Sequence, residues 1–279
     1  MDSDRKRVER CMIELFEQDI KTKDRHSSKG NQLKWKKAQI WYKADYTGYE
    51  GLSEYLISHL LLHSSLKPEE FVCYDLEQIQ YKSTHYNAAK CPDFLTDYQE
   101  LITLERLYQN MTGKSLTKEI LHIPDGEERF QFLVRETEKY TGLTDFACYL
   151  NKLFTIDAFF LNEDRHMHNI AVLMNPDGTF EYCPIFDNGA ALMSDTTMDY
   201  PLIGDMYSML TDVEAKTISR NFDEQLDLSE NYCGAHMTFS FTKKDVEKLL
   251  DEVSIYPDEI KNRVRDLVFY QMGKYQYLF

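Results

Sequence analysis

Hydrophobic residues over much of the chain recur at the three- or four-residue spacing of an amphipathic helix. This spacing predicts five helices in the later part of the chain, over residues 97–110, 126–140, 145–160, 243–255 and 257–275. A shorter pattern of the same kind predicts a helix over 8–20. Residues 190–241 are polar and show no such period, so we expect a long irregular segment there, of the kind that often carries function.

The pattern differs between residues 27 and 90, where strands and one helix are expected. Residues 38–46 alternate in the manner of a half-buried strand, and Lys43 lies within it. Residues 52–61 return to helical spacing and include Glu54. The sequence therefore predicts a strand followed by a helix, each carrying one charged side chain.

A β-hairpin is predicted further along. Residues 170–174 form a short apolar run, and Asn-Pro-Asp-Gly at 175–178 is a strong turn signal, because Pro suits the second turn position and Gly the fourth. Residues 179–186 then fit a returning strand. If Met174 faces Thr179 across the turn, the antiparallel register brings the residues on either side of the hairpin close together.

Polar side chains flank the open end of this hairpin. Asp164 precedes Asn169 by five residues, and Asp187 follows the returning strand. In the expected register His166 lies opposite Asp187, and Asn169 lies near Pro184. In magnesium-dependent phosphoryl transfer, one Asp acts on the acceptor hydroxyl while an Asn and a second Asp bind the metal. Loops are rich in Asp and Asn for other reasons, but this order around a hairpin favours a catalytic site.

These motifs resemble those of a known family. Asp-Arg-His-x-x-Asn at 164–169, followed by Phe-Asp-Asn-Gly at 186–189, resembles the catalytic and metal-binding loops of HipA-like kinases. These are bacterial serine/threonine kinases, several of them toxins, and they are distantly related to the phosphoinositide kinases. The resemblance therefore suggests a phosphotransferase.

The resemblance also implies roles for individual residues. Asp164 corresponds to the catalytic base and His166 to the histidine of the catalytic loop. Asn169 and Asp187 correspond to the magnesium ligands. Arg165 is not universal in the family, and its Asp-Arg-His form also resembles phosphoinositide kinases, which leaves lipid or small-molecule acceptors open.

The fold implied by the resemblance is α+β, a bilobal protein-kinase-like fold. A small mixed N-lobe with an antiparallel sheet is expected over 1–95, and a mainly helical C-lobe over 96–279. About a hundred N-terminal residues of the full family pattern are absent, so the chain resembles a shortened form. ATP and Mg²⁺ are the implied cofactors.

Lys43 and Glu54 match a further part of this pattern. Protein kinases pair a strand Lys with a helix Glu, and the pair steadies the ammonium group that contacts the phosphates. The family places its Glu within the helix, which favours Glu54 over Glu50, since we expect Glu50 in the preceding loop. Taken singly, each residue would more often be a solvated surface charge.

The loop over 27–35 resembles the family's phosphate-binding loop more loosely. Ser28, Lys29 and Gly30 are the expected nucleotide contacts, because small, flexible residues let backbone N–H groups approach phosphate oxygens. A plain flexible linker is the alternative. The resemblance further implies a serine in this loop that such kinases modify, so autophosphorylation at Ser27 or Ser28 is a hypothesis.

Asp93, Phe94 and Leu95 lie where the family has its hinge between the lobes. The family often has an acidic residue followed by Phe-Leu at this place. The resemblance implies that backbone groups here bind the edge of adenine.

Composition narrows the class of protein without identifying it. The 279 residues are 43% hydrophobic and 28% charged, as in soluble globular proteins. The net charge of −15 disfavours nucleic acid and anionic membranes as partners. No apolar run approaches the roughly 20 residues of a membrane span, and the charged start is unlike a secretory signal. We therefore expect a cytoplasmic protein.

Six cysteines lie at positions 11, 73, 91, 148, 183 and 233, without Cys-x-x-Cys spacing. This spacing favours free thiols in a reducing compartment over zinc binding.

The sequence and the resemblance together predict an ATP- and Mg²⁺-dependent phosphotransferase that acts on a Ser or Thr hydroxyl of a protein substrate. It could be a toxin module, and a regulatory protein partner is possible. Two alternatives stay open: a small-molecule or phosphoinositide-type lipid kinase, and a nucleotide-binding pseudokinase scaffold.

Overall fold

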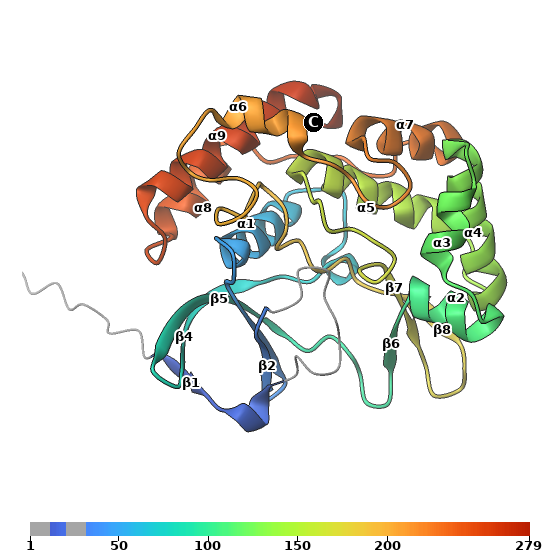
Figure 1. Cartoon of the computed structure of the whole chain (residues 1–279), viewed down its shortest axis with the longest axis horizontal. Coiled ribbons are helices and arrows are strands. Elements are labelled where there is room, and N and C mark those ends of the chain that lie inside the picture. The colour runs from blue at the N-terminus through green and yellow to red at the C-terminus, as the bar shows by residue number, and fades with distance from the viewer. Residues whose placement is uncertain (1–11, 21–31) are drawn as a thin grey trace, which may run out of the picture.

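The computed structural model describes residues 12–20 and 32–279. A curled sheet forms the N-terminal half and helices form most of the C-terminal half (Figure 1). This arrangement confirms the expected α+β class. The division into lobes at residue 95 stays a prediction.

The N-terminal sheet has five strands in the order β1-β4-β5-β3-β2, and only the β1–β4 pair is parallel. The strands are β1 (Ile13–Leu15), β2 (Lys34–Lys37), β3 (Ile40–Ala44), β4 (Asp75–Tyr81) and β5 (Thr84–Pro92). An antiparallel sheet was expected, and the parallel β1–β4 pair is the departure from it. Helix α1 (Glu50–Leu61) follows β3 and contacts β3, β4 and β5. The predicted strand and helix around Lys43 and Glu54 are thus confirmed.

The prediction of a helix over 8–20 is wrong for residues 12–20, the part that the structure describes. Residues 13–15 form β1, and the 3₁₀ helix η1 (Glu17–Asp19) follows. Leu15 is buried in a small core with Trp35 and Ile79. Short apolar runs fit a strand as well as a helix, and here pairing with β4 decides between them.

A second sheet of three strands has the order β6-β7-β8, comprising β6 (Glu100–Thr103), β7 (Ala171–Met174) and β8 (Phe180–Tyr182). The helix predicted over 97–110 is therefore wrong in its first part. Helix α2 (Leu104–Thr112) begins only after β6, where the Thr103 side chain accepts a hydrogen bond from the backbone N–H of Arg106. Pairing of β6 with β7 satisfies backbone groups that local periodicity does not reveal.

The predicted hairpin is confirmed, but its register is shifted by one residue. Met174 pairs with Phe180 rather than with Thr179. The returning strand ends at Tyr182, because the chain then leaves β7: the N–H of Ile185 donates to the carbonyl of Glu70. Pro184 has no N–H for a ladder. His166 and Asp187 therefore do not face each other as strand partners.

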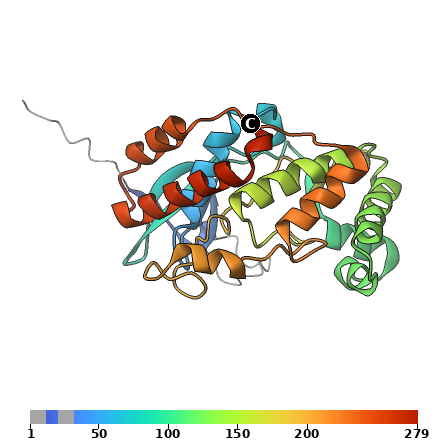
Figure 2. The same cartoon turned by 90° about the horizontal axis from the view of Figure 1, so that it is seen from above.

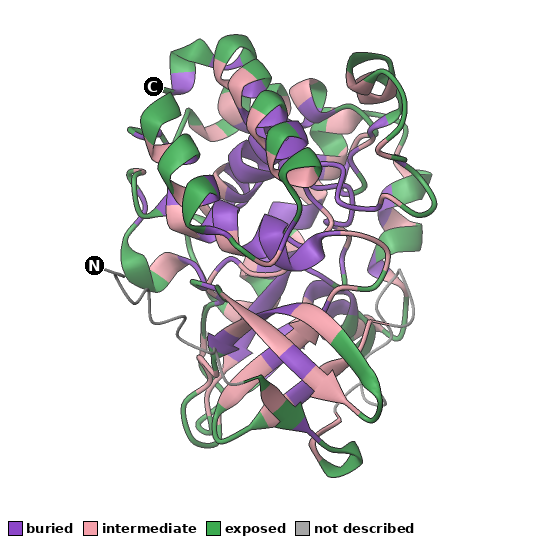
Figure 3. Cartoon of the chain, turned by 90° about the vertical axis from the view of Figure 1, so that its left-hand side faces the viewer, coloured by how far each residue is buried: buried purple, intermediate pink, exposed green. Residues whose placement is uncertain are grey.

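The C-terminal half contains most of the helices, in the order α3 (Leu116–His122), α4 (Gly126–Thr141), α5 (Phe146–Phe160), α6 (Met206–Met209), α7 (Phe222–Cys233), α8 (Lys243–Glu252) and α9 (Asp258–Lys274). The described residues also contain the short 3₁₀ helices η3 (Pro68–Glu70), η4 (Leu210–Asp212) and η5 (Gln276–Leu278). Helix α5 is central and contacts α4, α7 and α9 (Figure 2). Figure 3 shows the buried positions gathered inside this half.

The prediction of an irregular segment over 190–241 is partly wrong, because this range contains the twelve-residue helix α7. Asn221 caps this helix by accepting from the N–H of Glu224. Its buried face mixes Phe222 and Leu226 with the polar Gln225 and Ser229. This polar content hides the helical period in the sequence. None of the helices in the described ranges combines the length and apolar character that a membrane crossing needs.

Candidate active site

Lys43 joins three segments that are far apart in the sequence. Its Nζ lies 2.7 Å from Glu54 Oε1 and 2.7 Å from Asp187 Oδ1. Strand β3 presents Lys43, α1 presents Glu54, and the loop after β8 presents Asp187. The hydroxyl of Tyr74 lies 3.4 Å from the same nitrogen. The structure therefore brings together three of the residues that the sequence singled out.

Electrostatics keep Lys43 and Asp187 ionised. Burial alone lowers the pKa of Lys43, but the carboxylates of Asp187 and Glu54 outweigh burial and raise that pKa well above its usual value. Burial raises the pKa of Asp187, whereas Lys34 and Lys43 lower it, and the net pKa is far below its usual value. Asp187 is thus a carboxylate at any pH near neutrality.

Both carboxylate oxygens of Glu54 have a partner. Its second oxygen, Oε2, accepts a hydrogen bond of 2.9 Å from the backbone N–H of Asn188, and the side chain is almost fully buried. Glu50 proves to be the first residue of α1, not part of the preceding loop. Its carboxylate accepts from the backbone N–H groups of Thr47 and Gly48. Glu54 is therefore the partner of Lys43, and Glu50 holds the loop that precedes the helix.

Asp164 and Asn169 lie against each other in the turn-rich loop after α5. Asn169 Nδ2 donates to the carbonyl of Asp164 at 2.8 Å and to its Oδ2 at 3.2 Å. These bonds leave the amide oxygen of Asn169 as its remaining ligand atom. His166 Nε2 lies 3.7 Å from Asp164 Oδ1, and burial lowers the pKa of His166 although Asp164 opposes that shift.

The sequence analysis left Arg165 without a role, and the structure gives it one. The side chain is almost fully buried, and its Nε lies 3.1 Å from Oδ2 of the equally buried Asp157 on α5. Its Nη1 donates to the carbonyls of Asn169 and Phe186, at 3.2 and 2.6 Å. Its Nη2 donates to Asn188 Oδ1 at 2.7 Å. Arg165 therefore joins the loop that carries Asp164 to the loop that carries Asp187.

Asn162 makes a second link between the same loops. Its Nδ2 donates to Asp157 Oδ1 at 3.1 Å and to the carbonyl of Asp187 at 3.3 Å. Its Oδ1 accepts from the N–H of Asp164 at 3.2 Å. Asp187 itself has φ 63°, a left-handed conformation that Asp tolerates better than most residues. An Asn beside the Asp-Arg-His motif was the sequence signal for this role, but its partners are set by the fold.

The three residues expected at the hinge lie between the sheet and the hairpin. The N–H of Asp93 donates to the carbonyl of Gln39 at 2.8 Å, and its carboxylate pairs with Lys36. The ring of Phe94 lies 6.1 Å from that of Phe186, the residue before Asp187. Leu95 packs in the same small cluster as Phe94 and Phe186. Contact with adenine stays a prediction for this segment.

The residues expected in the phosphate loop, Ser28, Lys29 and Gly30, lie outside the described residues, as does Ser27. The nucleotide contacts predicted for them stay predictions.

The donor set suits a hard divalent cation. Mg²⁺ prefers oxygen ligands, with one or two carboxylates from the protein. Asp187 offers an ionised carboxylate, and Asn169 offers an amide oxygen whose partner nitrogen is already engaged. The chemistry and order of these groups fit the magnesium ligands that the resemblance implies.

Comparisons with known proteins give fold similarity but no match by sequence. No family model matches the chain, and no curated protein matches it. Among solved structures, the proinflammatory kinase CtkA of Helicobacter pylori superposes with a TM-score of 0.61 at 15% identity, over 94% of this chain and 95% of that one.

A second solved structure is HipA of the Shewanella oneidensis toxin–antitoxin system, determined with HipB and operator DNA. It superposes with a TM-score of 0.51 at 10% identity, over 93% of this chain and 63% of that one. The chain therefore spans under two thirds of this HipA. The structural resemblance to HipA-like kinases is confirmed, and at these identities it establishes a kinase-like fold.

Proposed function

We propose that this protein is an ATP- and Mg²⁺-dependent phosphotransferase, and specifically a protein serine/threonine kinase. The observation that carries the proposal is the position of Lys43 Nζ, 2.7 Å from both Glu54 and Asp187. A buried ammonium held between two carboxylates, beside an Asp/Asn pair, is the arrangement that phosphoryl transfer uses.

Each residue has a definable task in this reaction. Asp164 accepts the proton of the acceptor hydroxyl, and His166 lies beside it. Asn169 and Asp187 would hold Mg²⁺, which would supply the positive charge that neutralises charge developing on the phosphates. Lys43 contacts the phosphates while Glu54 fixes its position.

The segment after the metal-binding loop supports a polypeptide acceptor. Tyr200 donates to Glu163 Oε1 at 2.6 Å, which ties this segment to the residue before Asp164. In the same segment, Met198, Ile203 and Tyr207 are 75%, 88% and 54% exposed. Exposed apolar side chains grouped in one segment near a candidate site are typical of protein-binding surfaces.

The test is transfer of label from [γ-³²P]ATP in the presence of Mg²⁺, with protein, lipid and small-molecule acceptors offered separately. We expect label on protein Ser or Thr. Asp187→Asn should abolish transfer without unfolding the chain, whereas Asp251→Asn, the same change at an exposed position of α8, should leave transfer intact. Label on lipid or small molecules alone would contradict a protein acceptor and would identify a lipid or small-molecule kinase. Absence of transfer despite ATP binding would identify a pseudokinase.

A further inference from the structure

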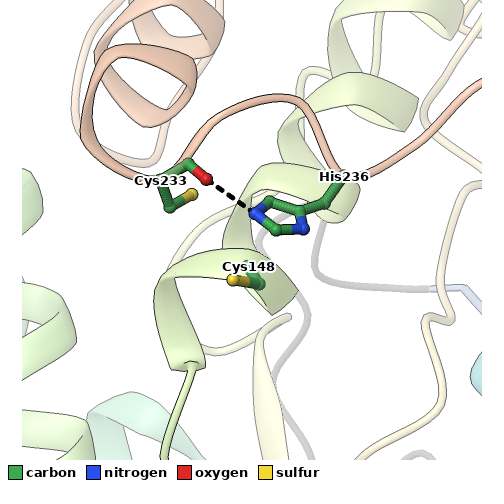
Figure 4. Close-up of side chains that lie close together, drawn as sticks. All are labelled: Cys148, Cys233 and His236. Carbon is green, nitrogen blue, oxygen red and sulfur yellow. Dashed lines mark hydrogen bonds between the residues drawn. The ribbon is translucent and has the colours of Figure 1, made fainter.

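Cys148, Cys233 and His236 form a cluster away from the Lys43 site. Cys148 lies in the first turn of α5, Cys233 is the last residue of α7, and His236 follows two residues after the helix-ending Gly234. One ligand atom from each, the two sulfurs and a ring nitrogen, lies within 4.8 Å of the others. Figure 4 shows these side chains facing the space between the two helices.

Hydrogen bonds fix the residues that carry this cluster. The backbone N–H of His236 donates to Asn151 Oδ1 at 2.8 Å, and Asn151 Nδ2 donates to Ser229 Oγ at 2.9 Å. The ring of His236 donates from Nε2 to the carbonyl of Cys233 at 2.7 Å. The loop is thus tied to both helices, so the three side chains are held close together before any ligand arrives.

The distances are near those of a metal site. Tetrahedral zinc with Zn–S bonds of about 2.3 Å places two sulfurs about 3.8 Å apart. Separations of at most 4.8 Å therefore need to contract by no more than about 1 Å, which side-chain rotation can supply. Cys-x-x-His, as in Cys233 and His236, also lets two ligands from one short segment reach one ion.

Glu230 provides a second observation beside this cluster. It lies one helical turn before Cys233 on α7, and its Oε1 is buried without a hydrogen-bond partner among the described residues. A buried carboxylate oxygen without a partner calls for an unseen water or ion.

We propose that Cys148, Cys233 and His236 bind one thiophilic divalent cation, with Zn²⁺ as the matching ion. Sulfur and imidazole ligands select such an ion over Mg²⁺, which prefers oxygen. Binding converts each thiol to a thiolate and releases its proton to solvent, with no change of oxidation state. Three protein ligands leave the fourth tetrahedral position to water.

The ion would join the start of α5 to the end of α7. Helix α5 also carries Asp157, the partner of Arg165, so the site would stabilise the helix on which the catalytic loop is anchored. None of the three ligands belongs to the proposed phosphotransfer machinery. The metal proposal and the kinase proposal can therefore fail separately.

The probe is Co²⁺, a spectroscopic substitute for zinc, added to the full chain after chelator treatment and in the presence of a phosphine reductant. We expect one Co²⁺ per chain, with thiolate-to-cobalt charge-transfer absorption and the intense visible bands of tetrahedral cobalt. Stoichiometric Zn²⁺ should then bleach both. Zn²⁺ should also raise the melting temperature, because it binds the folded state.

Variants separate a built site from incidental thiol binding. Cys148→Ser and Cys233→Ser should each weaken Co²⁺ binding by about 100-fold or more, since losing a ligand costs at least as much as losing a supporting group. Cys73→Ser, at an exposed cysteine outside the cluster, should bind like the unmodified chain. His236→Gln changes an exposed side chain, so folding should persist while the cobalt spectrum and the zinc-induced rise in melting temperature are lost.

Two results would overturn the proposal. One is the absence of a thiolate–cobalt band in the unmodified chain under reducing conditions. This result counts against the metal site even if Cys148 and Cys233 form a disulfide in a separate sample without reductant. The other is cobalt binding that is unchanged in both Cys148→Ser and Cys233→Ser.

Discussion

Replacing Arg165 with Met would test whether the buried ion pair holds together the loop of Asp164 and the loop of Asp187. The guanidinium reaches both oxygens of Asp157, at 3.1 and 3.2 Å, and donates to three acceptors in those loops. Met has similar length but no donor. After the change, Asp157 keeps a hydrogen bond from Asn162 but no opposite charge among its described partners.

The expected loss is large because Asp157 is fully buried. Removing one partner of a buried ion pair costs about 3–5 kcal/mol of unfolding free energy, since the remaining charge is left without compensation. Exposed pairs contribute far less, typically under about 1 kcal/mol. Arg135→Met, at a side chain that is 64% exposed, is therefore the matched control and should change stability by no more than about 0.5 kcal/mol.

The loss should depend on pH in a defined direction. Burial raises the pKa of Asp157, and Arg165 opposes that shift. Without Arg165 the pKa rises further, so the folded variant binds a proton that the unfolded chain releases above about pH 3.9. The folded state then holds more protons than the unfolded state, and stability falls as pH rises through the folded pKa. The variant should lose less stability at pH 5 than at pH 8.

Urea unfolding followed by circular dichroism, at pH 5 and pH 8, measures both effects. The double variant Asp157→Leu/Arg165→Met should regain part of the lost stability, because it leaves no unpaired charge. The reasoning is refuted if Arg165→Met costs less than about 1 kcal/mol at pH 8. It is also refuted if the double variant is no more stable than the single one.

Two substitutions and one measurement on the unmodified chain test the proposed phosphotransfer. Asp164→Ala should slow transfer by about 10²–10⁴-fold with nearly unchanged nucleotide affinity, because a base acts on the acceptor hydroxyl; a collapse of ATP binding in calorimetry would instead make Asp164 a metal ligand. Glu54→Gln should slow transfer by about 100-fold in steady-state assays, because Lys43 loses the charge that positions it, and an undiminished rate would contradict the pairing role. Autophosphorylation at Ser27 or Ser28 should appear in peptide mapping after incubation with ATP and Mg²⁺ and should weaken ATP binding through added negative charge; phosphate found only elsewhere would exclude it.

Local patterns in the sequence were sufficient where one short segment determines its own structure. The helices α4 and α5 begin close to their predicted positions, and α4 has Asp125 as its cap. The hairpin turn at 175–178 formed as its Pro and Gly predict. The order Lys, Glu, Asp, Asn, Asp was also visible without coordinates. For these features, the determining interactions lie within a few residues of one another.

Other local patterns failed where partners from elsewhere in the chain decide the structure. Residues 13–15 became a strand because β4 pairs with them, and residues 100–103 because β7 does. The returning strand of the hairpin ended early because Ile185 bonds to Glu70 instead. Backbone hydrogen bonds of this kind leave no periodic signal in the segment itself.

The site required the tertiary structure for its supporting contacts. Lys43 and Asp187 are brought to 2.7 Å because the segment after β8 packs on the sheet, where Phe186 contacts the cluster that includes Ala89 and Cys91. Arg165 pairs with Asp157, which lies on α5. The cluster of Cys148, Cys233 and His236 likewise exists only because α5 packs on α7. The sequence by itself determined which chemical groups are available and in what order. Only the fold decided which of them meet, because burial and long-range contacts set their distances and their charges.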